Sequence, residues 1–138
     1  MSVNRTLVIC KPDAVERGLA GEIIGRLERK GLRVVAGDFR RIDEALAAQH
    51  YEEHRTKPFY GELIEFITRS HSWVLVVEGP QDTWQIVRTL MGPTDPAQAP
   101  PGTIRGDLGC VLTENLVHGS DSAASAAREI ALFFPALV

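Results

Sequence analysis

A histidine flanked by small polar residues is the most reactive feature of the sequence. His118 follows the apolar residues Leu116 and Val117 and precedes Gly119-Ser120-Asp121-Ser122. We therefore expect it at the end of a strand, exposed at the start of a turn. A neutral imidazole is a competent nucleophile, and a partner that fixes its tautomer leaves the other nitrogen free to attack phosphorus. A structural or capping histidine is the alternative.

An arginine in a segment rich in glycine and proline favours anion binding. Arg105 lies within the sequence GTIRGD, where its planar guanidinium can approach phosphate oxygens closely. Arg88 and Thr94 lie upstream and offer a second cation and a hydroxyl. The alternative for Arg105 is a surface ion pair with Asp107 or Asp95, which contributes about 1 kcal/mol or less.

A lysine and two aromatic residues add to this interpretation. Lys11 follows an apolar run and precedes Pro12-Asp13, so its ammonium can point into a crevice beyond a sheet; a solvated lysine is the alternative. Tyr51 and Phe59 flank a break at Lys57-Pro58 and could hold a flat base, although aromatic residues more often pack in the core. Neither a Walker A loop nor a glycine-rich dinucleotide fingerprint occurs, so side chains would have to bind the phosphates.

The pattern His50-Tyr51-Glu52-Glu53-His54 matches a short zinc-peptidase motif, H-x-x-E-H. On one continuous helix both imidazoles would share a face. A catalytic zinc ion also needs a third protein ligand and an open position, and no downstream carboxylate motif supplies that ligand. We therefore predict no metal ion held by the protein itself.

The elements that position these residues follow from periodicity and chain breaks. Strands are predicted where β-branched and apolar residues run together, over residues 5–10, 32–42, 73–77 and 111–117. Helices are predicted from helical spacing and N-cap residues, over residues 23–30, 44–54 behind Asp43, 59–67, 84–91 and an alanine-rich segment ending near Phe134. Residues 92–109 contain four prolines and are expected to form a long functional loop without regular structure.

This order of elements predicts an α/β (α+β) sandwich. The expected architecture is ferredoxin-like, with a four-stranded antiparallel sheet covered by helices. Periodicity alone leaves a small doubly wound fold open. At 138 residues the chain is expected to form a single domain, residues 1–138.

Composition limits the classes of function. Hydrophobic residues at 44% and charged residues at 24% are typical of globular proteins, and a net charge of -3 argues against nucleic acid as the primary ligand. No apolar run approaches the roughly 20 residues of a membrane span, and no secretory signal is visible, so we expect a cytoplasmic protein without a membrane partner. Cys10 and Cys110 are expected to be free and largely buried.

Several motifs together resemble the nucleoside diphosphate kinase family, in its short bacterial form. They are Lys11-Pro12-Asp13, Arg17-Gly18-Leu19, Gly21-Glu22-Ile23-Ile24, Gly102-Thr103-Ile104-Arg105-Gly106-Asp107, Asn115-x-x-His118-Gly119-Ser120-Asp121-Ser122 and Glu129-Ile130. The resemblance extends from about Arg5 to Phe134, and the motifs around Arg105 and His118 are highly specific in this order and spacing.

The resemblance implies an enzyme of ferredoxin-like fold. It would transfer the γ-phosphate of a nucleoside triphosphate to a nucleoside diphosphate in a ping-pong reaction through a phosphorylated His118. Mg²⁺ would bridge the nucleotide phosphates, and ATP, GTP, GDP and other nucleotides would be the ligands. A homo-oligomer, either a tetramer or a hexamer, is also implied. The alternative is a non-catalytic nucleotide-binding or regulatory module, which predicts loss of part of the catalytic set; no member is missing from the sequence.

The resemblance also assigns the nucleotide-binding residues. Lys11 and Arg105 would contact the transferring phosphoryl group, and Arg88 and Thr94 the neighbouring phosphate. Asn115 and Lys11 would bind the ribose. Cations and hydroxyls at these positions suit phosphoryl transfer, whose transition state spreads negative charge over the phosphate oxygens.

The remaining roles concern the base and the histidine. Phe59 would stack on the base, which explains broad nucleotide specificity because every base has a π-face. Tyr51 would lie beside the phosphates near His118. Glu129, with Ser120 against it, would orient the imidazole.

Departures from the family pattern lie outside these positions. Ala14 stands where glycine is common, Ser70-His71-Ser72-Trp73 replaces a Ser-Gly-Pro entry to the central strand, and Leu108 replaces a common phenylalanine. We expect altered local packing with the chemistry intact.

Overall fold

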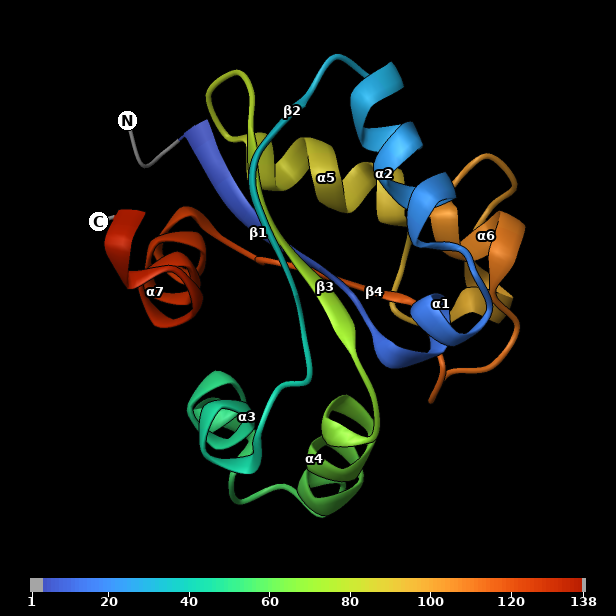
Figure 1. Ribbon diagram of the computed structural model, residues 1–138. Helices are drawn as coiled ribbons and strands as arrows, with labels where there is room; N and C mark the ends of the chain where they lie inside the picture. The colour runs from blue at the N-terminus through green and yellow to red at the C-terminus, as the bar shows by residue number, and fades with distance from the viewer. Residues whose placement is uncertain (1–3, 138) are drawn as a thin grey trace.

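The computed structural model describes residues 4–137 as an antiparallel sheet covered by helices on both faces (Figure 1). Its four strands are β1 Arg5–Cys10, β2 Arg33–Arg40, β3 Ser72–Glu78 and β4 Val117–Gly119. They lie in the order β2-β3-β1-β4, and every neighbouring pair is antiparallel. The ferredoxin-like prediction is confirmed, because a doubly wound fold is built on parallel strands.

Helices fill the connections between these strands. The α-helices are α1 Pro12–Glu16, α2 Ala20–Arg29, α3 Glu44–His50, α4 Tyr60–Thr68, α5 Thr83–Met91, α6 Ile104–Leu108 and α7 Ala123–Phe133. Short 3₁₀ turns are η2 Glu52–His54, η3 Pro96–Gln98 and η4 Pro135–Leu137. The predicted N-cap Asp43 accepts a hydrogen bond from the backbone N–H of Leu46, and Ser122 caps α7 in the same way through the N–H of Ser125.

The side chains of β1 alternate between two hydrophobic cores. Val8 and Cys10 pack with α2 and α5 on one face of the sheet. Leu7 and Ile9 pack with α3, α4 and α7 on the other face. Figure 1 shows these two groups of helices on opposite sides of the strands. Because both faces are covered, the central strands carry apolar residues at nearly every position.

Two predictions of helix and loop are wrong. The helix predicted for residues 44–54 ends at His50, because Tyr51 (φ -98°, ψ 23°) leaves the α-helical region and a 3₁₀ turn follows. The shared helical face expected for His50 and His54 is therefore absent. The segment 92–109 is not irregular throughout, because Asp95 and Thr103 each cap a short helix in it, η3 and α6.

Two further predictions fail beside the site. Lys11 leads directly into α1, in a segment where we had predicted no helix, since Pro12 fits the first turn of a helix. The strand predicted for residues 111–117 does not form: β4 begins only at Val117 and runs to Gly119, because Leu116 takes a left-handed conformation (φ 73°) that interrupts extended structure. His118 is consequently the middle residue of β4 and pairs with Ile9, where we had expected a strand end.

The remaining sequence expectations have mixed outcomes. Cys10 is buried but Cys110 is exposed, so the expectation of two buried thiols holds only for Cys10; both are free. The departure at residues 70–73 forms an aromatic cluster, in which Phe39 stacks on His71 at 4.8 Å and lies 5.1 Å from Trp73. Across residues 4–137, every helix is too short or too polar to span a membrane.

Candidate active site

The site residues predicted from sequence meet at one cavity of about 360 Å³. Nine of them line it: Lys11, Tyr51, Phe59, Arg88, Thr94, Arg105, Asn115, His118 and Glu129. The tenth, Ser120, lies fully buried behind Glu129. Residues from α5, α6, β4 and α7, with residues from the segments that follow β1 and α3, thus converge on one space.

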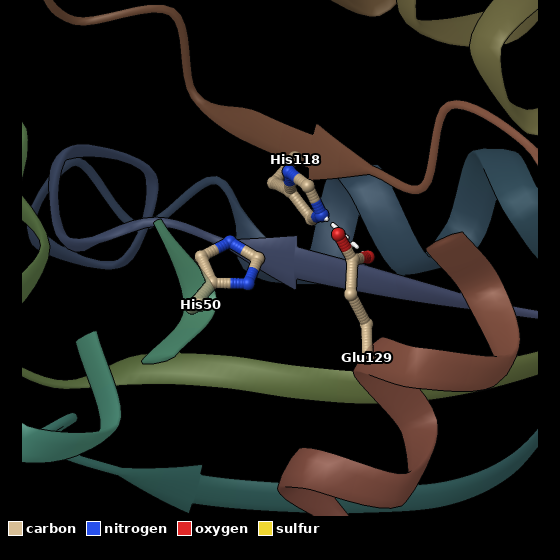
Figure 2. A group of neighbouring side chains, drawn as sticks. All are labelled: His50, His118 and Glu129. Carbon is tan, nitrogen blue, oxygen red and sulfur yellow. Dashed lines mark hydrogen bonds and ion pairs between the residues drawn. The ribbon is translucent and has the colours of Figure 1, made fainter. Parts of the chain in front are cut away.

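Glu129 holds His118 in a defined orientation. Its Oε1 lies 2.9 Å from Nε2 of His118 and accepts a hydrogen bond of 2.6 Å from Oγ of Ser120. Figure 2 shows the carboxylate of α7 meeting the imidazole of β4. An ionised carboxylate can only accept hydrogen bonds, so Nε2 is the donor in this contact, and in the neutral form of the imidazole Nδ1 carries the lone pair.

The charge of Glu129 is stabilised by the same contacts. Burial by itself raises the pKa of this carboxyl, but interaction with His118 and the hydrogen bond from Ser120 outweigh it and lower the pKa to about 2. The carboxylate therefore stays ionised at physiological pH. A fixed negative charge at Nε2 favours any state in which the imidazole becomes positive.

A strained turn places β4. Leu116 is fully buried with a positive φ, a conformation that is costly for a residue with a branched side chain. Its N–H donates to Oδ2 of Asp13 at 3.0 Å, and its carbonyl accepts from the backbone N–H of Lys11 at 2.9 Å. The junction of β1 and α1 thus holds both sides of the turn that precedes His118.

Arg105 fixes the same turn from the other side. Its guanidinium donates to three backbone carbonyls, those of Asn115 at 3.0 Å, Gly92 at 3.0 Å and Val117 at 2.7 Å. It is 4% exposed, so the alternative of a surface ion pair is wrong; Asp107 pairs with Arg26. Burial and the nearby charge of Arg88 lower the pKa of Arg105 to about 10, which leaves it charged at neutral pH.

Lys11 and Asn115 form a polar edge of the cavity. Nζ of Lys11 donates to Oδ1 of Asn115 at 3.0 Å, and Nδ2 of Asn115 donates to the carbonyl of Thr94 at 3.1 Å. Burial, with the charge of Arg105, lowers the pKa of Lys11 to about 8. The alternative of a freely solvated lysine is therefore excluded.

Arg88 reaches the site from α5 because that helix packs closely on β4. Its guanidinium donates to the carbonyl of Gly119 at 3.0 Å. A side chain at Gly119 would place its Cβ 2.6 Å from the sulfur of Met91, so glycine permits this approach without a shift of Met91. The cavity is therefore strongly cationic on one side, with Lys11, Arg88 and Arg105 together.

The opposite side of the cavity is aromatic. Tyr51 is buried, and burial together with the charge of Glu129 raises the pKa of its hydroxyl to about 12, so it remains a hydrogen-bond donor. Phe59 is 44% exposed at the cavity mouth, and its ring lies 5.8 Å from that of His54. An exposed aromatic face beside a cationic pocket suits a ligand with both a flat ring and phosphates.

Two residues near His118 were not predicted. Asp13 is a buried carboxylate that anchors the turn at Leu116; its place in the Lys-Pro-Asp motif was the available signal. His50 is buried with its ring centroid 4.6 Å from that of His118. Burial and the neighbouring His118 lower the pKa of His50 to about 3, so its ring is neutral. The H-x-x-E-H pattern had singled out His50, but with the wrong partner.

Comparisons with known proteins agree with this geometry. The family described as "Nucleoside diphosphate kinase" matches residues 4–137 of the chain. A relative of that name from Mycobacterium leprae is 59% identical over 135 residues, which cover 97% of this chain and 98% of that protein. The chain belongs to the nucleoside diphosphate kinase family. A second relative of that name, from Parafrankia sp., is 53% identical over 137 residues and 99% of each chain.

Solved nucleoside diphosphate kinases share the fold closely. The structure of a halophilic nucleoside diphosphate kinase from Halobacterium salinarum, in complex with CDP, has a TM-score of 0.91 and 54% identity, covering 94% of this chain and 86% of that one. A nucleoside diphosphate kinase family protein from Babesia bovis gives a TM-score of 0.93 at 46% identity, covering 97% and 90%.

Family membership defines the activity. As a nucleoside diphosphate kinase, the chain is a phosphotransferase that moves a phosphate from a nucleoside triphosphate to a nucleoside diphosphate. Enzymes of this family generally need a divalent cation, since phosphoryl transfer requires neutralisation of the phosphate oxygens. The predictions of an enzyme and of its reaction are confirmed.

Proposed function

We propose that the reaction proceeds through a phosphohistidine on Nδ1 of His118. The contact between Nε2 and Glu129 carries this proposal, because it leaves Nδ1 unprotonated. Nδ1 attacks the γ-phosphorus, the bond from that phosphorus to the β-γ bridging oxygen breaks, and the diphosphate departs with that oxygen. The imidazole gains positive charge at Nε2–H, beside the carboxylate, and no proton has to move. A second diphosphate then takes the phosphoryl group by the reverse steps.

The phosphate-binding roles follow from charge and position. Lys11 and Arg105 contact the transferring phosphoryl group, and Arg88 and Thr94 the neighbouring phosphate. Arg105 donates three of its five N–H groups to backbone carbonyls. It therefore acts on the phosphate through its charge and its two remaining N–H groups. Tyr51 adds a hydroxyl donor near His118. Fixed cations of this kind stabilise a charge that grows in the transition state.

The nucleoside lies towards the cavity mouth. Asn115 and Lys11, which already hydrogen-bond each other, bind the ribose hydroxyls. Phe59 stacks on the base with its exposed ring. Stacking accepts all bases, since each has a π-face. The CDP complex of the Halobacterium salinarum relative supports a nucleotide in a site of this family.

Mg²⁺ is the divalent cation we propose, held mainly by the nucleotide phosphates. Of the buried carboxylates near the site, Glu129 bonds His118, and Asp13, which bonds the backbone of Leu116, does not line the cavity. Glu53 and Asp121 lie at the cavity, exposed to water. Mg²⁺ commonly binds through substrate phosphates and few protein ligands, so this donor set fits. When bound, it neutralises charge on the phosphate oxygens.

We also propose the wider setting expected from sequence. Residues 1–138 act as one nucleoside diphosphate kinase domain, cytoplasmic, assembled as a tetramer or hexamer, with ATP, GTP, GDP and other nucleotides as ligands. β2 supports assembly, because it is an edge strand of the sheet and carries Phe39, 48% exposed. Sedimentation velocity distinguishes the two assemblies.

His118→Asn tests the mechanism against a non-catalytic binding module. We expect phosphoryl transfer to be lost, while ADP affinity, measured by calorimetry, changes less than about tenfold, because phosphate and base contacts come from other residues. A wild-type chain that binds ADP but transfers nothing would favour the binding module. Retained turnover in the variant would contradict the role of His118.

A further inference from the structure

His50 is a buried imidazole whose ring nitrogens are unused. It is 5% exposed, and neither Nδ1 nor Nε2 has a hydrogen-bond partner among residues 4–137. A buried polar atom without a partner costs about 1–3 kcal/mol, so its presence calls for a reason. Phosphoryl transfer, as described above, assigns His50 no role.

His50 completes a set of metal-binding groups. His50, His118 and Glu129 each offer one ligand atom, and these atoms lie within 4.8 Å of one another. Figure 2 shows the three side chains converging from α3, β4 and α7. Two imidazoles and one carboxylate, with an open fourth position, are a common zinc ligand set. We propose that these three residues bind a borderline divalent metal ion such as Zn²⁺, and that this ion inhibits phosphorylation of His118.

The geometry requires only a modest contraction. Ligand bonds of 2.0–2.1 Å in a tetrahedral site put the donor atoms about 3.3 Å apart. Nε2 of His118 and Oε1 of Glu129 already lie 2.9 Å apart, so His50 has to make most of the approach. All three residues line the cavity, which gives the ion an entry path and leaves room for a water molecule at the fourth position.

This ligand set differs from the H-x-x-E-H prediction. That pattern paired His50 with His54, on a helix that in fact ends at His50. His54 lies on the other side of Tyr51, with its ring 6.2 Å from the tyrosine ring. In the proposed site, His118 and Glu129, which are distant in sequence, take the place of His54 and of the missing third ligand.

Inhibition follows from the tautomer of His118 and rests on the proposed phosphohistidine mechanism. A metal ion takes the lone pair of Nε2, so the proton that Nε2 carried moves to Nδ1. Nδ1 then has no free lone pair for phosphorus. Mg²⁺ and Ca²⁺ prefer oxygen ligands and do not compete for this site, so the cation of the normal reaction leaves it free.

Direct zinc binding tests the site without using activity. The nucleotide-free enzyme is titrated with Zn²⁺ against a fluorescent chelator, with millimolar Mg²⁺ present. We expect one zinc ion per chain, and a loss of affinity of at least about 100-fold in His50→Gln. The matched controls are His54→Gln, which removes the other histidine of the motif, and His71→Gln on the surface. Neither should change zinc affinity.

Nitrogen NMR of the histidines covers the case in which His50→Gln fails to fold. On addition of Zn²⁺ to the wild-type chain, ¹⁵N signals from His50 and His118 should shift to metal-bound values, while those of His54 and His71 stay in place. Absence of binding, binding equal in His50→Gln, or a shift at His54 would overturn the site.

The inhibitory effect is measured separately. The enzyme is loaded with Zn²⁺ and mixed with ATP and Mg²⁺, and phosphohistidine is followed over seconds, before and after addition of a chelator. We expect the zinc-loaded chain to be phosphorylated at least about tenfold more slowly, with recovery by the chelator. Zinc binding without slowing would overturn the inhibition. A zinc-free chain that forms no phosphohistidine would instead contradict the proposed function, whatever its zinc affinity.

Discussion

The two sides of the cavity are built by different interactions. On the side of β4, Arg105, Asp13 and Glu129 make hydrogen bonds of 2.7–3.0 Å to the turn and to His118. On the side of α3 and α4, Tyr51 and Phe59 contact their neighbours through ring faces and edges. One side is held by directional bonds in a buried setting, and the other by ring packing that extends from the buried Tyr51 to the half-exposed Phe59.

This difference between the two sides corresponds to the parts of the nucleotide that all substrates share and the part in which they differ. Every nucleotide brings the same phosphates, so rigid hydrogen-bonded cations and a fixed imidazole suit all of them. The base differs from one substrate to another, and an exposed aromatic ring accepts each by stacking. We therefore expect mutations on the β4 side to affect catalysis and stability, and those on the α4 side to affect nucleotide affinity.

The largest effect is expected for Glu129→Gln. The amide keeps the shape but removes the charge that stabilises the imidazole as it is phosphorylated, so kcat should fall by about 10²–10⁴-fold with KM little changed. Steady-state kinetics with thermal melting checks this. Ser120→Ala leaves the carboxylate in place, so its kcat should fall much less. A Glu129→Gln enzyme with normal kcat would show that the β4 side does not depend on this charge.

Arg105→Lys should mainly reduce stability. A lysine ammonium cannot donate to the three carbonyls that the guanidinium fork reaches, and buried acceptors would lose partners. The free energy of unfolding in urea should fall by about 2–4 kcal/mol. Arg17→Lys is the control, because Arg17 makes one exposed hydrogen bond and should change stability by about 0.5 kcal/mol or less. If Arg105→Lys lowers the free energy of unfolding by less than about 1 kcal/mol, Arg105 does not have this structural role.

Phe59→Ala tests the aromatic side. Loss of stacking, worth about 1–3 kcal/mol per base, should raise KM about tenfold or more for every nucleotide, with kcat changed far less. Stability should hardly change because the ring is half exposed. Kinetics with ADP, GDP and CDP measures this. A drop in kcat at constant KM would show that Phe59 acts in catalysis, as expected for residues on the β4 side of the cavity.

The smallest effect concerns the proton of Lys11. Its pKa of about 8 lies below the ordinary lysine value because of burial, and a bound phosphate should raise it again. ADP binding at pH 8.5 should therefore take up a fraction of a proton, detected by calorimetry in buffers of different ionisation enthalpy. Lys11→Gln should abolish the uptake. Equal heats in all buffers for the wild-type chain would contradict the lowered pKa.

The same shift sets a stability trend. The unfolded chain holds the lysine proton more tightly than the folded chain, so the contribution of Lys11 makes folding less favourable below its folded pKa. This cost disappears as pH rises from about 8 towards 10.5. Nucleotide-free wild type should gain stability relative to Lys11→Gln over this range.

Local sequence patterns predicted the sheet and most helices but not the geometry at His118. Continuous apolar runs identify β1 and β3 because both faces of these strands are buried. The left-handed turn at Leu116 could not be predicted, because it is stabilised by Asp13 from a distant part of the chain. Motif resemblance singled out Arg105 as a phosphate ligand, but its three bonds to carbonyls depend on tertiary contacts. The contact between the rings of His50 and His118 could not be predicted, because the two residues are remote in sequence.

We propose that His118 carries the phosphoryl group between the two nucleotides. The direct test is an intact-mass spectrum at neutral pH after brief exposure to ATP and Mg²⁺, repeated after addition of GDP. We predict one phosphoryl group per chain, its disappearance with formation of GTP, and no adduct in His118→Asn. Formation of GTP without any phosphorylated chain, or an adduct that persists in His118→Asn, would contradict the mechanism.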